Sequence, residues 1–134
     1  MSTVVQIQAK GSRSRLEIGK NEAVDGYSSF WMLADIQCDW MQMYSKLRDV
    51  HFVALEKFVE QLDAFVLNRQ LQPHLEGTEG TWLAFQEEGR RVLLRFALGA
   101  IKDCMPHQHQ GSFELEEADL SELAVAFSRL FEDR

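Results

Sequence analysis

The same apolar spacing occurs twice in this chain and predicts two amphipathic helices. The first set is Leu55, Phe58, Val59, Leu62, Phe65 and Val66, and the second is Leu120, Leu123, Ala124, Phe127, Leu130 and Phe131. Each set recurs at i, i+3, i+4, i+7, i+10 and i+11, which places its side chains along one face of a helix. We expect the first helix to run from a cap at Asp49 to about Leu71, because Pro73 prevents continuation. The second is expected to follow a cap at Asp119, with Glu122 completing a capping box.

The remaining segments alternate apolar and polar residues, which is typical of antiparallel strands with one covered face. Residues 4–9 and 13–18 predict an opening hairpin, and residues 112–116 predict a last strand. Residues 32–41 predict one long strand that continues to Leu47 or bends near Gln42. Residues 81–87 and 91–98 flank Glu88 and Gly89, where glycine favours a tight turn. Residues 21–29, 74–80 and 99–110 are expected to be loops.

These elements predict a single α+β domain over residues 1–134, with a mostly antiparallel sheet and both amphipathic helices packed on one face. The apolar face of the sheet is expected to include Val92, Leu94, Phe96 and Leu98, which alternate with Arg91, Leu93, Arg95 and Ala97. A chain of 134 residues is long enough to bury one ordinary core.

The charge of the chain favours a basic partner. Its 14 basic and 21 acidic residues give a net charge of −7, which repels nucleic acid and anionic membranes. Residues 114–134 contribute seven acidic and only two basic side chains. The chain has no pattern of a secretion leader and no membrane-length apolar run, so we expect a cytoplasmic protein. Cys38 and Cys104 are expected to be free thiols, although their spacing leaves a bridge open.

The expected uncovered face of the long strand is the candidate partner-binding surface. It would carry Trp31, Leu33, Asp35, Asp39, Met41 and Met43, with Leu93 and Ala97 added from facing strands. Apolar side chains mixed with charge are typical of protein interfaces. The acidic pair Glu116 and Glu117 extends this hypothesis to the acidic C-terminal region. The alternatives are that the chain's own loops cover this face or that a homodimer does.

One cluster has the residue types of a metal site. Cys104, His107, His109 and Glu114 include the ligands that zinc and iron use, and the spacing of the two histidines and the glutamate resembles the first metal motif of cupins. The flanking glycines and the second half of that motif are absent, and two helices do not suit an all-β barrel. No nucleophile, phosphate-loop or dinucleotide motif occurs, so no cofactor is predicted.

The order of elements resembles a group of small bacterial immunity-like proteins encoded beside wall-associated and other polymorphic toxins. The residues that carry the resemblance are the spacing of Leu55, Phe58 and Leu62, the hairpin over residues 82–98, and the spacing of Leu120, Leu123, Phe127 and Leu130. The resemblance implies a non-enzymatic α+β protein that binds a partner, such as a basic toxin. The alternatives are a metal-dependent or small-molecule enzyme that uses the cluster at residues 104–114, and an acidic secretion chaperone.

Overall fold

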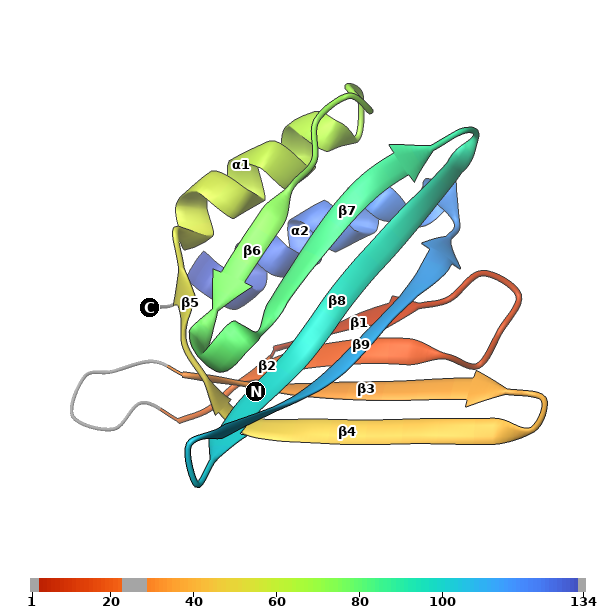
Figure 1. The fold of residues 1–134 in the computed structure, drawn as a ribbon. Coiled ribbons are helices and arrows are strands. Elements are labelled where there is room, and N and C mark those ends of the chain that lie inside the picture. Colours follow the sequence, from red (N-terminus) through yellow and green to blue (C-terminus); the bar gives the residue numbers. More distant parts are fainter. Residues whose placement is uncertain (1–2, 23–28, 133–134) are drawn as a thin grey trace.

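The computed structural model describes residues 3–22 and 29–132. This part of the chain contains nine strands, two α-helices and two short 3₁₀ helices (Figure 1). In order they are β1 (Val4–Gln8), β2 (Arg15–Lys20), β3 (Phe30–Cys38), β4 (Met41–Val50), β5 (Phe52–Val53), α1 (Leu55–Phe65), β6 (His74–Gly77), η1 (Thr78–Gly80), β7 (Trp82–Glu88), β8 (Arg91–Lys102), β9 (Met105–Leu115), η2 (Glu117–Asp119) and α2 (Leu120–Glu132).

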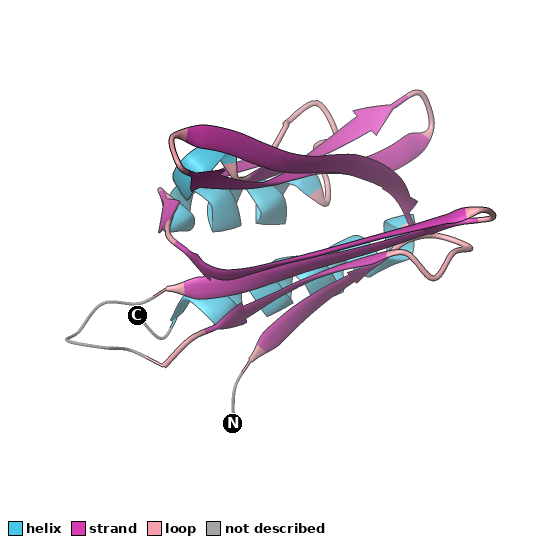
Figure 2. Cartoon of the chain, turned by 60° about the horizontal axis from the view of Figure 1, so that its bottom comes forward, coloured by secondary structure: helices cyan, strands magenta, loops and turns pink. Residues whose placement is uncertain are grey.

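The strands form two antiparallel sheets, so the predicted α+β class is confirmed. The first sheet has the order β1-β2-β3-β4, and the second has the order β5-β6-β7-β8-β9. Figure 2 shows them as two layers viewed nearly edge-on. Neither α1 nor α2, nor any other helix within residues 3–22 and 29–132, is long and apolar enough to cross a membrane.

The two halves of the chain repeat one topology, and the helix of each half packs on the sheet of the other half. In each half a meander of four main strands is followed by a helix, which begins at Leu55 after Val50 and at Leu120 after Leu115. The ring of Phe58 on α1 lies 6.3 Å from that of Phe85 in the second sheet, whereas the ring of Phe131 on α2 lies 5.3 Å from that of Phe30 in the first sheet. Each helix therefore packs on the sheet that does not precede it.

One hydrophobic core joins both sheets and both helices. Phe127 lies at its centre, with its ring 5.1 Å from that of Phe58, 5.8 Å from that of Phe131 and 6.3 Å from that of Phe85. The predicted inner face of β8 is confirmed, since its alternating apolar residues are buried: Val92, Leu94, Phe96 and Leu98. The apolar stripes of both helices also belong to the core, as their spacing predicts, together with the inward-facing residues of the other strands.

The predicted strand from residue 32 is confirmed as far as Cys38, but it does not continue to Met41 or Leu47, because the chain reverses at Asp39 and Trp40, close to the alternative bend near Gln42. Met41 pairs with Cys38, and Met43 pairs with Ile36, so β3 and β4 form a hairpin. Met41 and Met43 therefore lie on the same face of the sheet as Ile36. Trp31 and Leu33 lie on the opposite face, because side chains alternate along β3.

The second long hairpin and one short strand also differ from expectation. Residues 99–110, expected to be irregular, belong to β8 and β9 except for the turn at Asp103 and Cys104. The expected loop at residues 74–80 contains β6, which pairs with both β5 and β7. The opening hairpin and the turn at Gly89 are confirmed, and most of the expected loop at residues 21–29 lies outside the described residues.

The first helix is shorter than its apolar pattern. It begins after Ala54, which has left-handed backbone geometry (φ 55°) and no side-chain capping bond, so the predicted cap at Asp49 is wrong. It ends at Phe65, so the predicted end near Leu71 is wrong, and Arg69 donates hydrogen bonds to the carbonyl oxygens of Phe65 (3.0 Å) and Val66 (3.2 Å). These bonds satisfy carbonyl groups that the helix end leaves without a partner.

Candidate functional site

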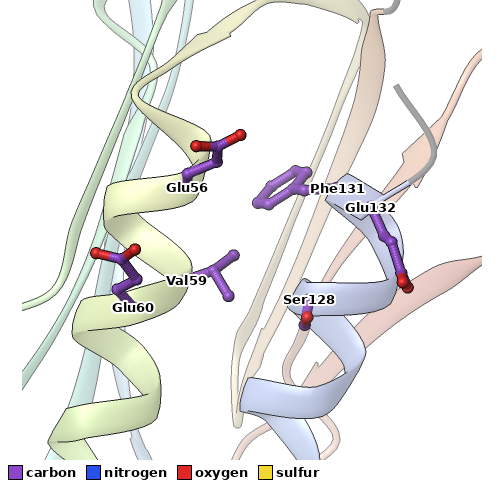
Figure 3. A pocket seen from close by; sticks show the side chains of 6 residues that line it. All are labelled: Glu56, Val59, Glu60, Ser128, Phe131 and Glu132. Carbon is purple, nitrogen blue, oxygen red and sulfur yellow. The ribbon is translucent and has the colours of Figure 1, made fainter.

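The candidate site is a groove between α1 and α2, on the side of the helices that faces away from the core (Figure 3). Two overlapping hollows of about 300 and about 430 Å³ lie along it. We call it the interhelical groove and define it by its lining: Glu56, Val59, Glu60, Asp63, Ala124, Val125, Ser128, Arg129, Phe131 and Glu132.

The floor of the interhelical groove is apolar because the two helices meet there through small and aliphatic side chains. Val59 is half-buried and Ala124 is buried, and Phe131 closes one end with its ring (Figure 3). Val125 is half exposed (50%) on the α2 side. A partner in the groove removes apolar surface from water mainly at Val59 and Val125, because Ala124 and Phe131 are already buried in the core.

The rim of the interhelical groove is acidic. Glu56, Glu60 and Asp63 recur on one side of α1 at i, i+4 and i+7, and Glu132 stands at the end of α2. Arg129 is the one basic side chain among the residues that line the two hollows. Four acidic groups and one basic group beside an apolar floor suit a segment that is both basic and apolar.

The residues of the partner-binding surface predicted from the sequence do not lie on one face of the structure. Trp31, Leu33 and Asp35 lie together on the outer face of the first sheet. Met41 and Met43 lie on the inner face and are 48% and 39% exposed, because they extend past the region that the helices cover. Asp39 lies in the hairpin turn and belongs to neither face. Of the two expected additions, Ala97 is fully buried and Leu93 is half-buried, and both lie in the second sheet.

Asp35 is bound within the protein. Its carboxylate accepts hydrogen bonds from Gln42 (3.0 Å) and Arg15 (2.7 Å), and Arg15 also contacts Glu17 (2.6 Å). The hydrogen bond from Gln42, helped by Arg15, lowers the pKa of Asp35 against the opposing effect of burial. The carboxylates of Glu17 and Asp35 raise the pKa of Arg15. This network stabilises the outer face of the first sheet, and its charges are already paired.

Glu116 and Glu117 lie between the end of β9 and α2, away from the outer face of the first sheet. Glu116 is exposed. Glu117 accepts a hydrogen bond from Arg69 (2.6 Å), whose guanidinium also lies 3.5 Å from the carboxylate of Glu87. Glu117 therefore helps to hold Arg69 at the end of α1.

The residues of the metal alternative do not form one site. His109 is buried in β9, His107 is exposed, and Cys104 is exposed in the β8–β9 turn. Glu114 lies on the opposite face of β9 from His109 and forms an ion pair with Lys10 (3.3 Å). Within residues 3–22 and 29–132, no group of three or more His, Cys, Asp or Glu side chains is arranged to hold a metal ion. Cys38 is also an exposed free thiol.

His109 instead joins the two sheets. Its Nδ1 lies 2.7 Å from the hydroxyl of Ser45 on β4, and its ring packs edge-on against Phe96 (5.7 Å between ring centroids). Burial disfavours the charged imidazolium and therefore lowers the pKa of His109.

Sequence reasoning did not find the interhelical groove. The acidic side of α1 was visible in the spacing of Glu56, Glu60 and Asp63, but its partner helix is far away in the sequence. Only the packing of α1 beside α2 makes the two sides into one groove. No family model, curated protein or solved structure matches this chain.

Proposed function

We propose that this protein is a protein-binding domain that receives a basic, partly apolar segment of its partner in the interhelical groove. The observation that carries the proposal is the combination of accessible apolar side chains at Val59 and Val125 with an acidic rim. The net charge of −7 supports it, because a negative protein attracts a basic partner over long range.

The floor and the rim have different roles in this proposal. An exposed ion pair contributes only about 0.2–1 kcal/mol, so the carboxylates of the rim mainly speed encounter and select a basic partner. The apolar floor excludes water from the complex and lengthens its lifetime. Binding is therefore expected to weaken as the salt concentration rises, without disappearing.

The kind of partner distinguishes two forms of the proposal. An immunity-like protein that covers a basic toxin binds a folded domain, whereas an acidic secretion chaperone binds a segment that is unfolded. Hydrogen exchange on the partner in the complex separates them, because a folded partner keeps slow-exchanging amides outside the contact and an unfolded one does not. The resemblance to immunity-like proteins favours the first form.

The test uses a fluorescent helical peptide that carries leucines on one face and lysines on the other. The protein is titrated into the peptide, and binding is followed by fluorescence anisotropy. We expect saturable binding that the double variant Glu60→Lys with Asp63→Lys weakens by about ten-fold or more, because it reverses two charges of the rim. The matched control is Glu22→Lys with Glu88→Lys, which makes the same change of net charge at exposed positions away from the groove.

Equal loss of binding in both double variants would contradict the proposal, because it would show that net charge alone attracts the peptide. Equal binding by wild type and the Glu60 and Asp63 variant would also contradict it. Val125→Ala tests the apolar side of the groove and is expected to weaken binding without changing its salt dependence.

A further inference from the structure

Within residues 3–22 and 29–132, no strand pairs with the outer edge of β4. It is the last strand of the first sheet, and β3 pairs with it on one side only. Alternate residues of such a strand turn their amide and carbonyl groups away from the sheet. In Figure 1, β4 lies along the lower margin of the molecule: no other described element lies beyond it toward the β3–β4 turn, whereas the β8–β9 hairpin passes below its opposite end.

The half of β4 nearest this turn lacks the features that normally prevent edge pairing. Residues 40–45 contain no charge and no proline. They also expose large side chains, with Trp40 86% and Tyr44 57% exposed. The charges of the strand are confined to its other half, at Lys46, Arg48 and Asp49.

This distribution makes the edge complementary to itself. An acidic residue, Asp39, stands at the turn end of the uncharged stretch, and Lys46, Arg48 and Asp49 together give the other end a net charge of +1. A second strand of the same sequence, running antiparallel, brings the basic end of each copy to the acidic end of the other.

We propose that two copies of this protein pair antiparallel through β4, about a two-fold axis at Met43. In this register Met43 lies opposite its counterpart, and Trp40 lies opposite Lys46 of the second copy, where a cation can stack on the indole ring. Asp39 then lies opposite Leu47 of the second copy, between Lys46 and Arg48 along that strand. The two first sheets become one continuous sheet of eight strands.

The area of the contact predicts a dimer of moderate strength. Trp40, Met41, Met43 and Tyr44 together expose on the order of 400–500 Å² per copy, taking about 200 Å² for a fully exposed large side chain. With the strand backbone, the pair reaches the lower end of specific interfaces, about 1,200 Å² in total. The dimer is therefore expected to dissociate on dilution.

Sedimentation equilibrium of the whole chain over a wide concentration range tests the proposal. We expect Tyr44→Lys and Tyr44→Glu each to raise the dimer dissociation constant by about ten-fold or more, because residue 44 lies diagonal to its own counterpart and like charges repel. An equimolar mixture of the two variants is expected to restore dimers. Val125→Lys, at an exposed position on α2, is the control.

A wild-type protein that stays monomeric at the highest soluble concentration would overturn the proposal. A dimer that the Tyr44 variants leave intact, or that their mixture fails to restore, would overturn it as well. Circular dichroism establishes that each variant is folded.

A second measurement does not depend on the Tyr44 variants. Met43→Cys, in a chain that also carries Cys38→Ser and Cys104→Ser, places two thiols across the axis, where directly opposite Cβ atoms lie about 4.5–5.5 Å apart. Mild oxidation is expected to give a covalent dimer, whereas Val125→Cys in the same background stays monomeric. The interhelical groove lies on other elements, so this outcome is independent of the proposed function.

Discussion

Ser45 on β4 and His109 on β9 share a hydrogen bond of 2.7 Å that joins the two sheets. Because burial lowers the pKa of His109, the folded state favours the neutral imidazole. The stabilisation is complete above the ordinary histidine pKa and is lost as the pH falls toward the lower pKa of the folded state.

We therefore expect the free energy of unfolding of the wild-type protein to fall between pH 7 and pH 5. In His109→Gln this fall is expected to be smaller. Glutamine retains a polar partner for Ser45 but does not titrate. Urea denaturation of both proteins at several pH values measures the difference. A constant difference between wild type and variant from pH 5 to pH 8 would show that His109 does not contribute to the pH dependence. His107→Gln is the control, because His107 is exposed.

A second loss of stability at acid pH is expected from Asp35. Here the folded state favours the charged form of the side chain, whereas at His109 it favours the neutral form. Its pKa is lowered, so its contribution to stability is present above the ordinary aspartate pKa and is lost as the pH falls through the folded-state value. We expect Asp35→Asn to destabilise the protein by about 1–3 kcal/mol at pH 7, because it weakens the hydrogen bonds to Arg15 and Gln42. Urea denaturation at pH 7 and near pH 3 is the measurement. The deficit should shrink at the acid pH, and a deficit that persists there unchanged would argue for a packing effect.

Removal of the central ring of the core tests the packing of the two halves. Phe127 is fully buried and its ring contacts those of Phe58, Phe85 and Phe131. Phe127→Ala is expected to lower the free energy of unfolding by about 3–5 kcal/mol. Val125→Ala, two positions away and half exposed, is expected to change it by less than about 0.5 kcal/mol. Equal effects of the two substitutions would contradict the assigned inner face of α2.

The start of α1 offers a substitution that should stabilise the protein. Ala54 has a φ of 55°, a region that costs a residue with a Cβ about 1 kcal/mol. We expect Ala54→Gly to raise the midpoint of thermal unfolding, corresponding to about 0.5–1 kcal/mol. The same substitution at Ala64, inside α1, is expected to destabilise the protein by about 1 kcal/mol. Shifts of the same sign at both positions would contradict the left-handed geometry of Ala54.

The sequence predicts the elements whose signals are local. The apolar spacing of both helices and the glycine in the β7–β8 turn are sufficient for these, and the structure confirms them. The β3–β4 and β8–β9 hairpins lack such a signal. Asp103 and Cys104 both have positive φ angles (54° and 64°), the geometry of a tight hairpin turn, yet neither is a glycine.

The candidate site and the end of α1 depend on contacts between distant residues. The sequence predicts a first helix that runs to about Leu71, but the helix ends at Phe65, and Arg69 satisfies its last carbonyl groups through hydrogen bonds that a pattern of apolar residues does not contain. The interhelical groove needs both helices, and β6 is a strand only because β5 and β7 lie on either side of it. The expected sheet face failed for a simpler reason: reversal at Asp39 placed Met41 and Met43 on the other side.

The exchange of helices between the halves has a consequence for synthesis on the ribosome. When Phe65 has just been added to the chain, the second sheet, which α1 covers, has not been synthesised, and the first sheet still lacks Phe131 of α2. The first half therefore exposes its inner face until the last helix is released. A nascent chain that stops before α2 therefore retains an apolar sheet face that Phe131 does not cover, and such exposed apolar surface makes a partly folded chain prone to aggregation.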